Sequence, residues 1–314
     1  MFNLNNQAEK ISRRRTLLRK PRIGLTLAGG GCKAFFGLGV GKVLMEAGIK
    51  FHAVSGTSAG SAMAMSLISG QVENLVEYFY AITSRNRRNF YWSRLLLGRQ
   101  PFPHERMYRS AILTYVDPER ILKSKVKLAF NAMRVPPGLF PPDNAFRRYR
   151  LVTEIIGAYR NEIKFAEQGM FRPFLAQAGR RNGLEEVVFT EQDLHSRDHA
   201  LQIVLASSCV PPLVSYQKLP DGFHYLDGGI ENNLPIVHLP DCDLYITVYY
   251  EEITRRLMEQ AGHDRGKNIY YIAPAGELPI TTWDYANPKG VRECYDYGRR
   301  AGERALPEIR RLLG

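Results

Sequence analysis

The first part of the chain alternates short apolar runs with glycine turns and helical apolar spacing. Residues 23–28 form an apolar run that stops at three glycines, as a buried strand does. From 33 to 47 the apolar residues recur at helical spacing. A second apolar run, 51–55, ends at Gly56, and a helix rich in alanine and methionine follows to about Gly70. This order predicts a βαβα unit with parallel strands and a right-handed crossover.

The middle of the chain is less regular. Residues 84–110 mix arginine with aromatic residues, and 134–142 contain prolines that interrupt any long element. Residues 143–180 predict a basic helical segment. Regular patterns then return, and they predict a strand at 186–190, a helix at 198–207, strands at 223–226 and 243–249, and an amphipathic closing helix at 290–313.

The length and composition bound the domain organisation. A chain of 314 residues, 45% of them hydrophobic and 24% charged, fits one large globular domain. We predict a basic, flexible tail at 1–20 and one domain at 21–314, in which 134–180 is a variable insertion or lid. No apolar stretch reaches the ~18 residues of a spanning helix, and the polar, basic start lacks a signal core. These features predict a cytoplasmic protein, with peripheral membrane association as an option.

The net charge of +12 favours an anionic partner, either lipid headgroups or nucleic acid. At 85–99, arginines surround Phe90, Tyr91, Trp92 and three leucines, a mixture suited to a membrane interface. The same mixture also suits nucleic acid or simple packing on the body of the protein, and a basic tail also serves solubility alone. Of these alternatives, we predict an anionic membrane surface as the partner and disfavour nucleic acid.

Neither cysteine nor histidine spacing predicts a metal site. The four cysteines are far apart and read as reduced thiols. His195 and His199 are four residues apart and could share one helix face, but the sequence offers no third ligand beside them. No metal and no cofactor is predicted.

The strongest local signal is the sequence GTSAG at 56–60, which has the form G-x-S-x-G. It lies between a predicted strand and a predicted helix, the context that a nucleophile elbow requires. Small neighbours allow a strained turn that exposes the hydroxyl of Ser58, and the helix N-terminus behind it supplies amide donors. The alternative is a strand-to-helix turn with an incidental serine.

The second signal is GGGCKA at 29–34, also at a strand end. A dinucleotide fingerprint would need an acidic residue at the end of the next strand, which instead ends VSG, and a P-loop would need Ser or Thr after Gly-Lys. The remaining interpretation is an oxyanion loop of Gly29, Gly30 and Gly31, whose N–H groups would face a developing negative charge. Both glycine segments follow strands joined by one crossover, so they emerge at the same edge of the sheet.

A nucleophilic serine needs a base. The sequence LDGG at 226–229 places Asp227 at a predicted strand end, with two glycines that turn the chain. An Asp-Gly pair alone is usually a simple turn. A histidine could serve instead, as in ordinary α/β-hydrolases, and His238 and His263 lie suitably downstream.

These motifs together resemble the bacterial patatin-like phospholipase family. The resemblance covers about 23–249 and also includes ASSCVP at 206–211 and NLP at 233–235. It implies an α/β, three-layer fold with a central, largely parallel sheet flanked by helices. It also implies a dyad without histidine, in which Ser58 is the nucleophile and Asp227 the proton acceptor, with the oxyanion hole at Gly30 and Gly31. The implied substrate is a phospholipid or other lipid ester, and the resemblance leaves an activating partner or small-molecule activator open.

Two positions depart from the family pattern: Lys33 stands where arginine is frequent, and Ala34 where glycine is usual. Lysine keeps a positive charge but loses the bidentate fork. Lys33 and Ala59 are the residues predicted to contact substrate. The predicted function is a phospholipase A-like lipid acyl hydrolase. The alternatives are a soluble esterase or thioesterase, or a catalytically silent lipid- or nucleotide-sensing module, which would have no need of an intact serine, aspartate and glycine loop.

Overall fold

The computed structural model describes residues 20–96, 101–139, 145–211 and 217–314. The predicted tail lies outside this range except for Lys20, as do parts of the 85–99 and 134–180 segments. No helix in the described part of the chain is long and apolar enough to cross a membrane.

The described residues form an eight-stranded sheet with the order β5-β6-β3-β2-β1-β7-β8, and β4 pairs with β3 outside this path. Neighbours from β3 to β8 are parallel, whereas β4 and β6 are antiparallel to β3. The strands are β1 (Ile23–Leu27), β2 (Phe51–Thr57), β3 (Lys127–Arg134), β4 (Glu185–Phe189), β5 (Gln217–Lys218), β6 (His224–Asp227), β7 (Leu244–Val248) and β8 (Ile269–Ile272).

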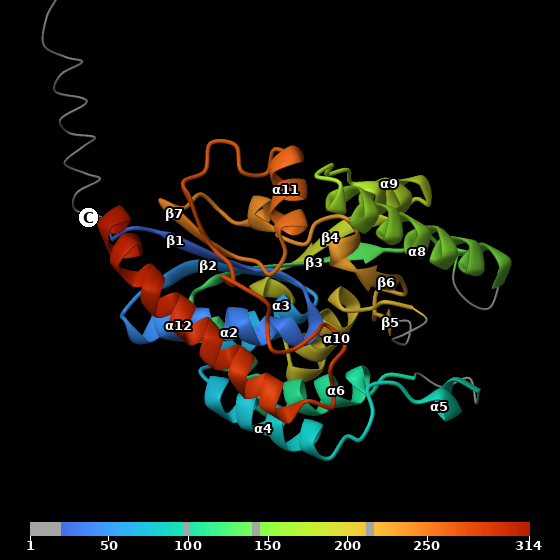
Figure 1. Ribbon diagram of the computed structural model, residues 1–314, viewed down its shortest axis with the longest axis horizontal. Coiled ribbons are helices and arrows are strands. Elements are labelled where there is room, and N and C mark those ends of the chain that lie inside the picture. Colours follow the sequence, from blue (N-terminus) through green and yellow to red (C-terminus); the bar gives the residue numbers. More distant parts are fainter. Residues whose placement is uncertain (1–19, 97–100, 140–144, 212–216) are drawn as a thin grey trace, which may run out of the picture.

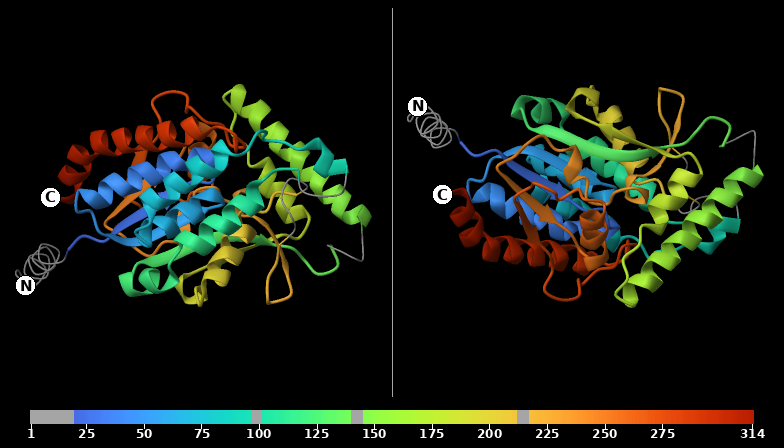
Figure 2. Two further views of the ribbon diagram at one scale, coloured as in Figure 1. Left: turned by 90° about the horizontal axis from the view of Figure 1, so that it is seen from below. Right: turned by 90° about the horizontal axis from the view of Figure 1, so that it is seen from above.

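Helices flank this sheet on both sides (Figure 1). One face carries α2, α3 and α12, the other carries α11, and α8 and α9 lie beyond one end (Figures 1 and 2). The helices are α2 (Ala34–Glu46), α3 (Ala59–Ile68), α4 (Val72–Ser84), α5 (Trp92–Leu96), α6 (His104–Tyr115), α7 (Pro118–Ser124), α8 (Ala145–Glu167), α9 (Phe174–Arg181), α10 (Arg197–Ser207), α11 (Glu252–Gln260) and α12 (Pro288–Leu313). The predicted α/β class with a largely parallel central sheet is confirmed.

The central strands are apolar because both of their faces are covered. Every residue of β1 and of β7 is buried, as expected for parallel strands between two helical layers. The main core lies between the sheet and α2, α3 and α10, and a second cluster on the opposite face includes Leu234, Ile236 and Met258. The sheet therefore lies between two apolar layers, and the loops follow the ends of its strands.

Glycines let α2 and α12 approach each other closely. A Cβ placed on Gly298 would lie 2.0 Å from the backbone oxygen of Phe36, and one on Gly39 would lie 2.1 Å from that of Tyr295. Backbone atoms of two packed helices cannot move aside as a flexible side chain can. The closing helix predicted from its amphipathic pattern is thus held against α2 by positions that require glycine.

The largest difference from the sequence prediction lies in the middle of the chain. The patterns at 84–110 and 134–142 are irregular and no element is predicted between them, yet this region contains α6, α7 and β3, the strand next to β2. Six consecutive residues of β3, Leu128–Met133, are buried, so its sequence shows no alternation of apolar and polar positions. The alanines of this segment and the charged residues at its two ends are also compatible with a helix or a loop. The predicted helical segment 143–180 corresponds to α8 and α9.

We predict that Gly298→Ala lowers the free energy of unfolding by about 1–3 kcal/mol, because the added methyl group overpacks the contact with α2. Urea denaturation followed by circular dichroism measures this change. Gly157→Ala is the matched control, since Gly157 lies within α8 and a Cβ there meets nothing within 4 Å. The control should stabilise the protein by up to ~1 kcal/mol through helix propensity. Equal effects of the two substitutions would contradict the close-packing interpretation.

Candidate active site

Ser58 occupies a strained turn between β2 and α3. Its φ of 54° and ψ of −126° lie in a region that a residue with a side chain rarely adopts. The turn is tight because Gly60 packs on the end of β1, where a Cβ would lie 2.3 Å from the backbone oxygen of Leu27. A Cβ on Gly56 would lie 2.6 Å from the carbonyl carbon of Gly60. The two glycines of the G-x-S-x-G pattern are therefore required by backbone contacts, and the serine is presented at the start of a helix.

Hydrogen bonds from other elements fix this turn. The N–H of Ser58 donates to Ser207 Oγ at 2.8 Å, and Ser207 Oγ donates to the backbone oxygen of Asn131 at 2.7 Å. Thr57 Oγ1 donates to Asn131 Oδ1 at 2.7 Å. Ser207 lies within the ASSCVP motif, but nothing local in the sequence marks Asn131, and its role was missed.

The sheet register brings Asp227 to Ser58. Thr57 at the end of β2 pairs with Asn131 of β3, and Asp227 at the end of β6 pairs with the next residue, Ala132. At Ala132 the strand β4 is also paired to β3. Each edge of β3 can pair with only one strand at a given residue. Strand β4 therefore occupies one edge of β3, and β2 and β6 share the other edge. The two strands thus meet end to end beside β3, which brings Ser58, directly after β2, close to Asp227.

The hydroxyl of Ser58 is close enough to the carboxyl group of Asp227 to lower the pKa of that carboxyl. The carboxyl group accepts a hydrogen bond of 2.7 Å from the N–H of Gly229, while the N–H of Asp227 donates to the Cys209 oxygen at 2.8 Å. Burial raises the pKa of the Asp227 carboxyl to about 6, although Ser58 and Gly229 favour the carboxylate. An acid with this pKa is ionised at neutral pH and can still take up a proton, as a general base must.

The glycine loop lies beside these two residues. The N–H of Gly29 donates to Asn233 Oδ1 at 3.0 Å, and Asn233 Nδ2 donates back to the Gly29 oxygen at 3.3 Å. Gly31 has a φ of 55°, and a Cβ there would lie 2.1 Å from the backbone oxygen of Thr282. Among the described residues, the N–H groups of Gly30 and Gly31 have no hydrogen-bond acceptor. Of the three predicted donors, two therefore have N–H groups free for an oxyanion.

The two predicted substrate contacts differ in their surroundings. Lys33 Nζ forms an ion pair with Glu251 Oε1 at 2.5 Å, and both residues line the cavity described next. The side chain of Ala59 is completely buried in the main core and does not line this cavity. Glu251 is separated from Lys33 by 218 residues, so no local pattern could have identified this partner.

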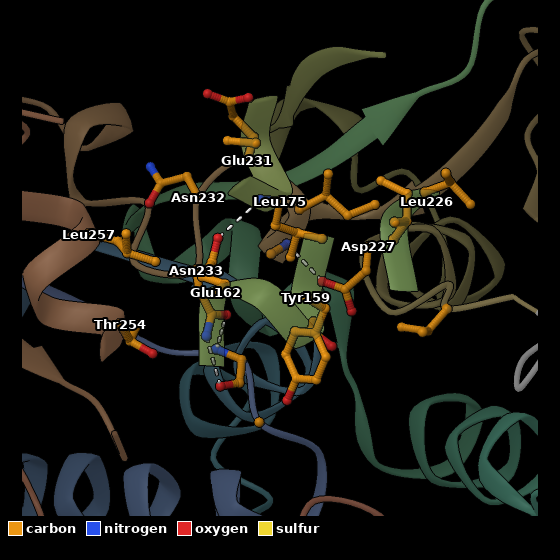
Figure 3. A pocket seen from close by; sticks show the side chains of 18 of the residues that line it. Tyr159, Glu162, Leu175, Leu226, Asp227, Glu231, Asn232, Asn233, Thr254 and Leu257 are labelled. Atoms are coloured by element: carbon orange, nitrogen blue, oxygen red, sulfur yellow. Dashed lines mark hydrogen bonds between the residues drawn. The ribbon is translucent and has the colours of Figure 1, made fainter. Parts of the chain in front are cut away.

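Ser58, Asp227 and the glycine loop line a cavity of about 630 Å³. Helix α8 supplies one apolar wall, which includes Leu151, Ile155 and Ile163. Thr254 and Leu257 of α11 lie across the cavity from Leu226 and Asp227 (Figure 3). The segment predicted as an insertion or lid is thus a wall of the site. A volume of this size accommodates a ligand with acyl chains.

Of the histidines considered from the sequence, His263 lines this cavity, whereas His238, His195 and His199 do not. His238 Nε2 lies 3.0 Å from Glu186 Oε2, and His263 Nδ1 lies 3.3 Å from Asn232 Nδ2. Neither histidine has a hydrogen bond to Ser58 or Asp227 among the contacts of the described residues. The rings of His195 and His199 are 5.3 Å apart. In the described ranges, no group of three or more His, Cys, Asp or Glu residues is arranged to hold a metal ion.

Comparison with known proteins identifies a family for this arrangement. The family model described as patatin-like phospholipase matches residues 25–239. No curated protein matches the chain.

Three solved structures are similar to the chain. VipD from Legionella pneumophila is 15% identical with a TM-score of 0.43, and the match covers 91% of this chain and 67% of that one. Human GIVD cytosolic phospholipase A2 is 12% identical with a TM-score of 0.42, covering 98% and 65%. The type III effector protein ExoU is 17% identical with a TM-score of 0.36, covering 92% and 53%. The chain therefore spans between about half and two thirds of these proteins. Because all three TM-scores are below 0.5, the family assignment depends on the family model.

Proposed function

The chain belongs to the patatin-like phospholipase family, and on this premise we propose that it is a phospholipase A-like lipid acyl hydrolase that uses Ser58 and Asp227. The observation that carries the proposal is the convergence of Ser58, Asp227 and the glycine loop, from adjoining strand ends, on one cavity of about 630 Å³ with apolar walls. The substrate is a carboxylic ester of a membrane lipid, whose acyl chain occupies the apolar part of the cavity.

In the first step, the carboxylate of Asp227 accepts the hydroxyl proton while Ser58 Oγ attacks the acyl carbonyl carbon. The negative charge that develops on the carbonyl oxygen is stabilised by the N–H groups of Gly30 and Gly31. Collapse of the tetrahedral intermediate breaks the bond to the lipid alcohol, which takes the proton from Asp227. The products of this step are a lysolipid and an acyl-serine ester.

In the second step, Asp227 accepts a proton from water as the water oxygen attacks the acyl-serine. The same donors stabilise the second oxyanion. Its collapse releases a fatty acid and returns the proton to Ser58, so the enzyme is regenerated. The strained turn supports both steps, because it holds Oγ clear of its own backbone and beside Asp227.

A fluorophosphonate probe should label the wild-type protein, and Ser58→Ala should remain unlabelled. Asp227→Asn keeps the size of the side chain but removes the proton acceptor, so kcat should fall by orders of magnitude while the fold is retained. Activity against phospholipids, lysolipids, neutral lipids and short esters measures both changes, with circular dichroism as the check on folding. If the His238→Ala or His263→Ala protein is folded and inactive, a histidine is the base and the dyad proposal is wrong. Preference for short esters or thioesters over every lipid would favour a soluble esterase.

The pKa of Asp227 sets the expected pH dependence. Because the base must be ionised, kcat/KM for a water-soluble short-chain ester should be constant above about pH 7 and fall as pH drops through about 6. At lower pH it should lose about tenfold per pH unit. A histidine base would give a similar midpoint, so the profile should be repeated at a second temperature. Carboxyl ionisation has little enthalpy and its midpoint should stay in place, whereas an imidazole midpoint would move down on warming.

We further propose that the protein docks on anionic membranes through the arginine-rich segment at 85–99. Arg85, Arg87 and Arg88 follow α4 and are exposed, and none of them has an ion pair among the described contacts. Each cation near an anionic surface contributes about 1 kcal/mol, within a Debye length. The segment at 1–20 adds further basic residues.

Vesicle sedimentation should therefore show tighter binding to anionic than to neutral liposomes, and this preference should weaken as salt increases. The double substitution Arg87→Glu/Arg88→Glu should reduce the anionic preference far more than Lys50→Glu. Lys50 is also exposed, but it lies directly before β2, at the opposite end of this strand from Ser58. If the double variant binds like the wild type, the segment is not a docking surface. If DNA or RNA competes better than any vesicle, nucleic acid is the partner of this surface.

A further inference from the structure

Four aromatic rings form a continuous row from solvent to the cavity. The ring centroids of Trp92 and Phe90 are 4.6 Å apart, those of Phe90 and Phe102 are 5.2 Å apart, and those of Phe102 and Trp283 are 5.1 Å apart. These residues come from α5, from the segments on either side of it, and from the segment before α12, so only the fold brings them together. Each separation is within the range of direct aromatic contact.

The outer end of the row is exposed in a way that folding does not explain. The side chain of Trp92 is 69% exposed, and Phe90, Phe102 and Trp283 are each part-exposed. An exposed tryptophan gains little from packing, and a row of part-exposed rings presents a connected apolar surface. In both views of Figure 2, α5 lies at the same end of the molecule as α8, which walls the cavity.

The inner end of the row is part of the cavity wall. Trp283 lines the cavity together with Thr282 and Tyr285. The backbone oxygen of Thr282 accepts a hydrogen bond of 3.1 Å from the N–H of Cys32, directly after the glycine loop. A chain that followed the row would therefore enter the cavity beside the N–H groups proposed to bind the oxyanion.

We propose that this aromatic row, Trp92–Phe90–Phe102–Trp283, is the surface along which an acyl chain of an anionic-membrane glycerolipid passes from the bilayer into the cavity. This inference rests on the proposed function, because the acyl chain that enters the cavity is taken to belong to the substrate. Exposed arginines next to the row, Arg87 and Arg88, complement an anionic surface, and the row is continuous with the substrate cavity. Tryptophan is suited to the outer position because its ring partitions into the membrane interface.

The chain offers a direct test, because Trp92 and Trp283 are its only two tryptophans. In a Ser58→Ala background, which prevents turnover, Trp283→Phe leaves Trp92 as the sole fluorophore, and Trp92→Phe leaves Trp283. Both proteins are titrated with anionic vesicles whose phospholipids carry bromine on the acyl chains, and with unbrominated vesicles of the same headgroup composition. We expect bromine-dependent quenching of both tryptophans. Quenching of neither, or of Trp92 alone, would overturn the proposal, because the acyl chain would then not reach the inner end of the row.

A kinetic experiment tests the same row through turnover. Trp92→Ala should lower the ratio of kcat/KM on anionic vesicles to kcat/KM on a soluble short-chain ester by about tenfold, chiefly through KM for vesicles. Leu122→Ala is the matched control, since Leu122 is an exposed apolar residue (47%) on α7, outside the row, and should leave the ratio unchanged. An equal loss on both substrates, or an unchanged ratio in Trp92→Ala, would contradict the proposal. If no ester is hydrolysed at all, the proposed function fails, whereas the quenching result still decides whether the row receives acyl chains.

Discussion

The geometry of this site depends on two strands that end at the same point beside β3. The strand β2 ends at Thr57, which pairs with Asn131, and the antiparallel β6 ends at Asp227, which pairs with Ala132. Hydrogen bonds tie this junction together, because Asn131 Nδ2 donates to the backbone oxygens of Gly228 at 3.2 Å and Asn232 at 2.9 Å. Asn131 also holds Thr57 through its Oδ1. One buried amide therefore connects the segment before the serine to the segment after the aspartate, and a shift of either strand would separate the proposed nucleophile from its base.

Burial then tunes the chemistry that this junction allows. A carboxyl group in water would be a weak base for a serine hydroxyl, and complete desolvation without partners would leave it protonated. Asp227 lies between these limits, because burial raises its pKa while the Ser58 and Gly229 donors favour the ionised form. The strain at Ser58 is balanced in a similar way, since the Ser207 hydroxyl and the glycine contacts hold the turn that positive φ disfavours.

The cationic side chains of the cavity and those of the outer surface differ in their surroundings. Within the cavity, the cations Lys33 and Arg180 are paired with Glu251 and Glu231, so the wall offers little net positive charge to a ligand. The exposed arginines after α4 are outside it. This division agrees with the proposed docking on an anionic membrane and the proposed apolar binding of an acyl chain, and the aromatic row joins the two regions.

The sequence by itself determined the local units. The order from β1 to α3 follows from glycines at strand ends and from helical apolar spacing, and the predicted bounds agree with the structure to within about two residues. The candidate residue Ser58 could be singled out for the same reason, since a strained turn leaves glycines at fixed neighbouring positions. Such signals survive in sequence because the constraint acts between residues close in the chain. Asp227 was singled out through the family resemblance, because an Asp-Gly pair alone is usually a simple turn.

Only the tertiary structure decided what these units do together. The strand β3 gave no alternating pattern because it is buried on both faces, and the importance of Asn131 follows from its neighbours in space. The Lys33 partner, the occupied Gly29 amide and the cavity walls on α8 and α11 all join residues distant in the chain. The sequence also carried no sign that Trp92 and Trp283 belong to one row. Contacts of this kind depend on how the layers pack, and packing places no periodic constraint on either partner alone.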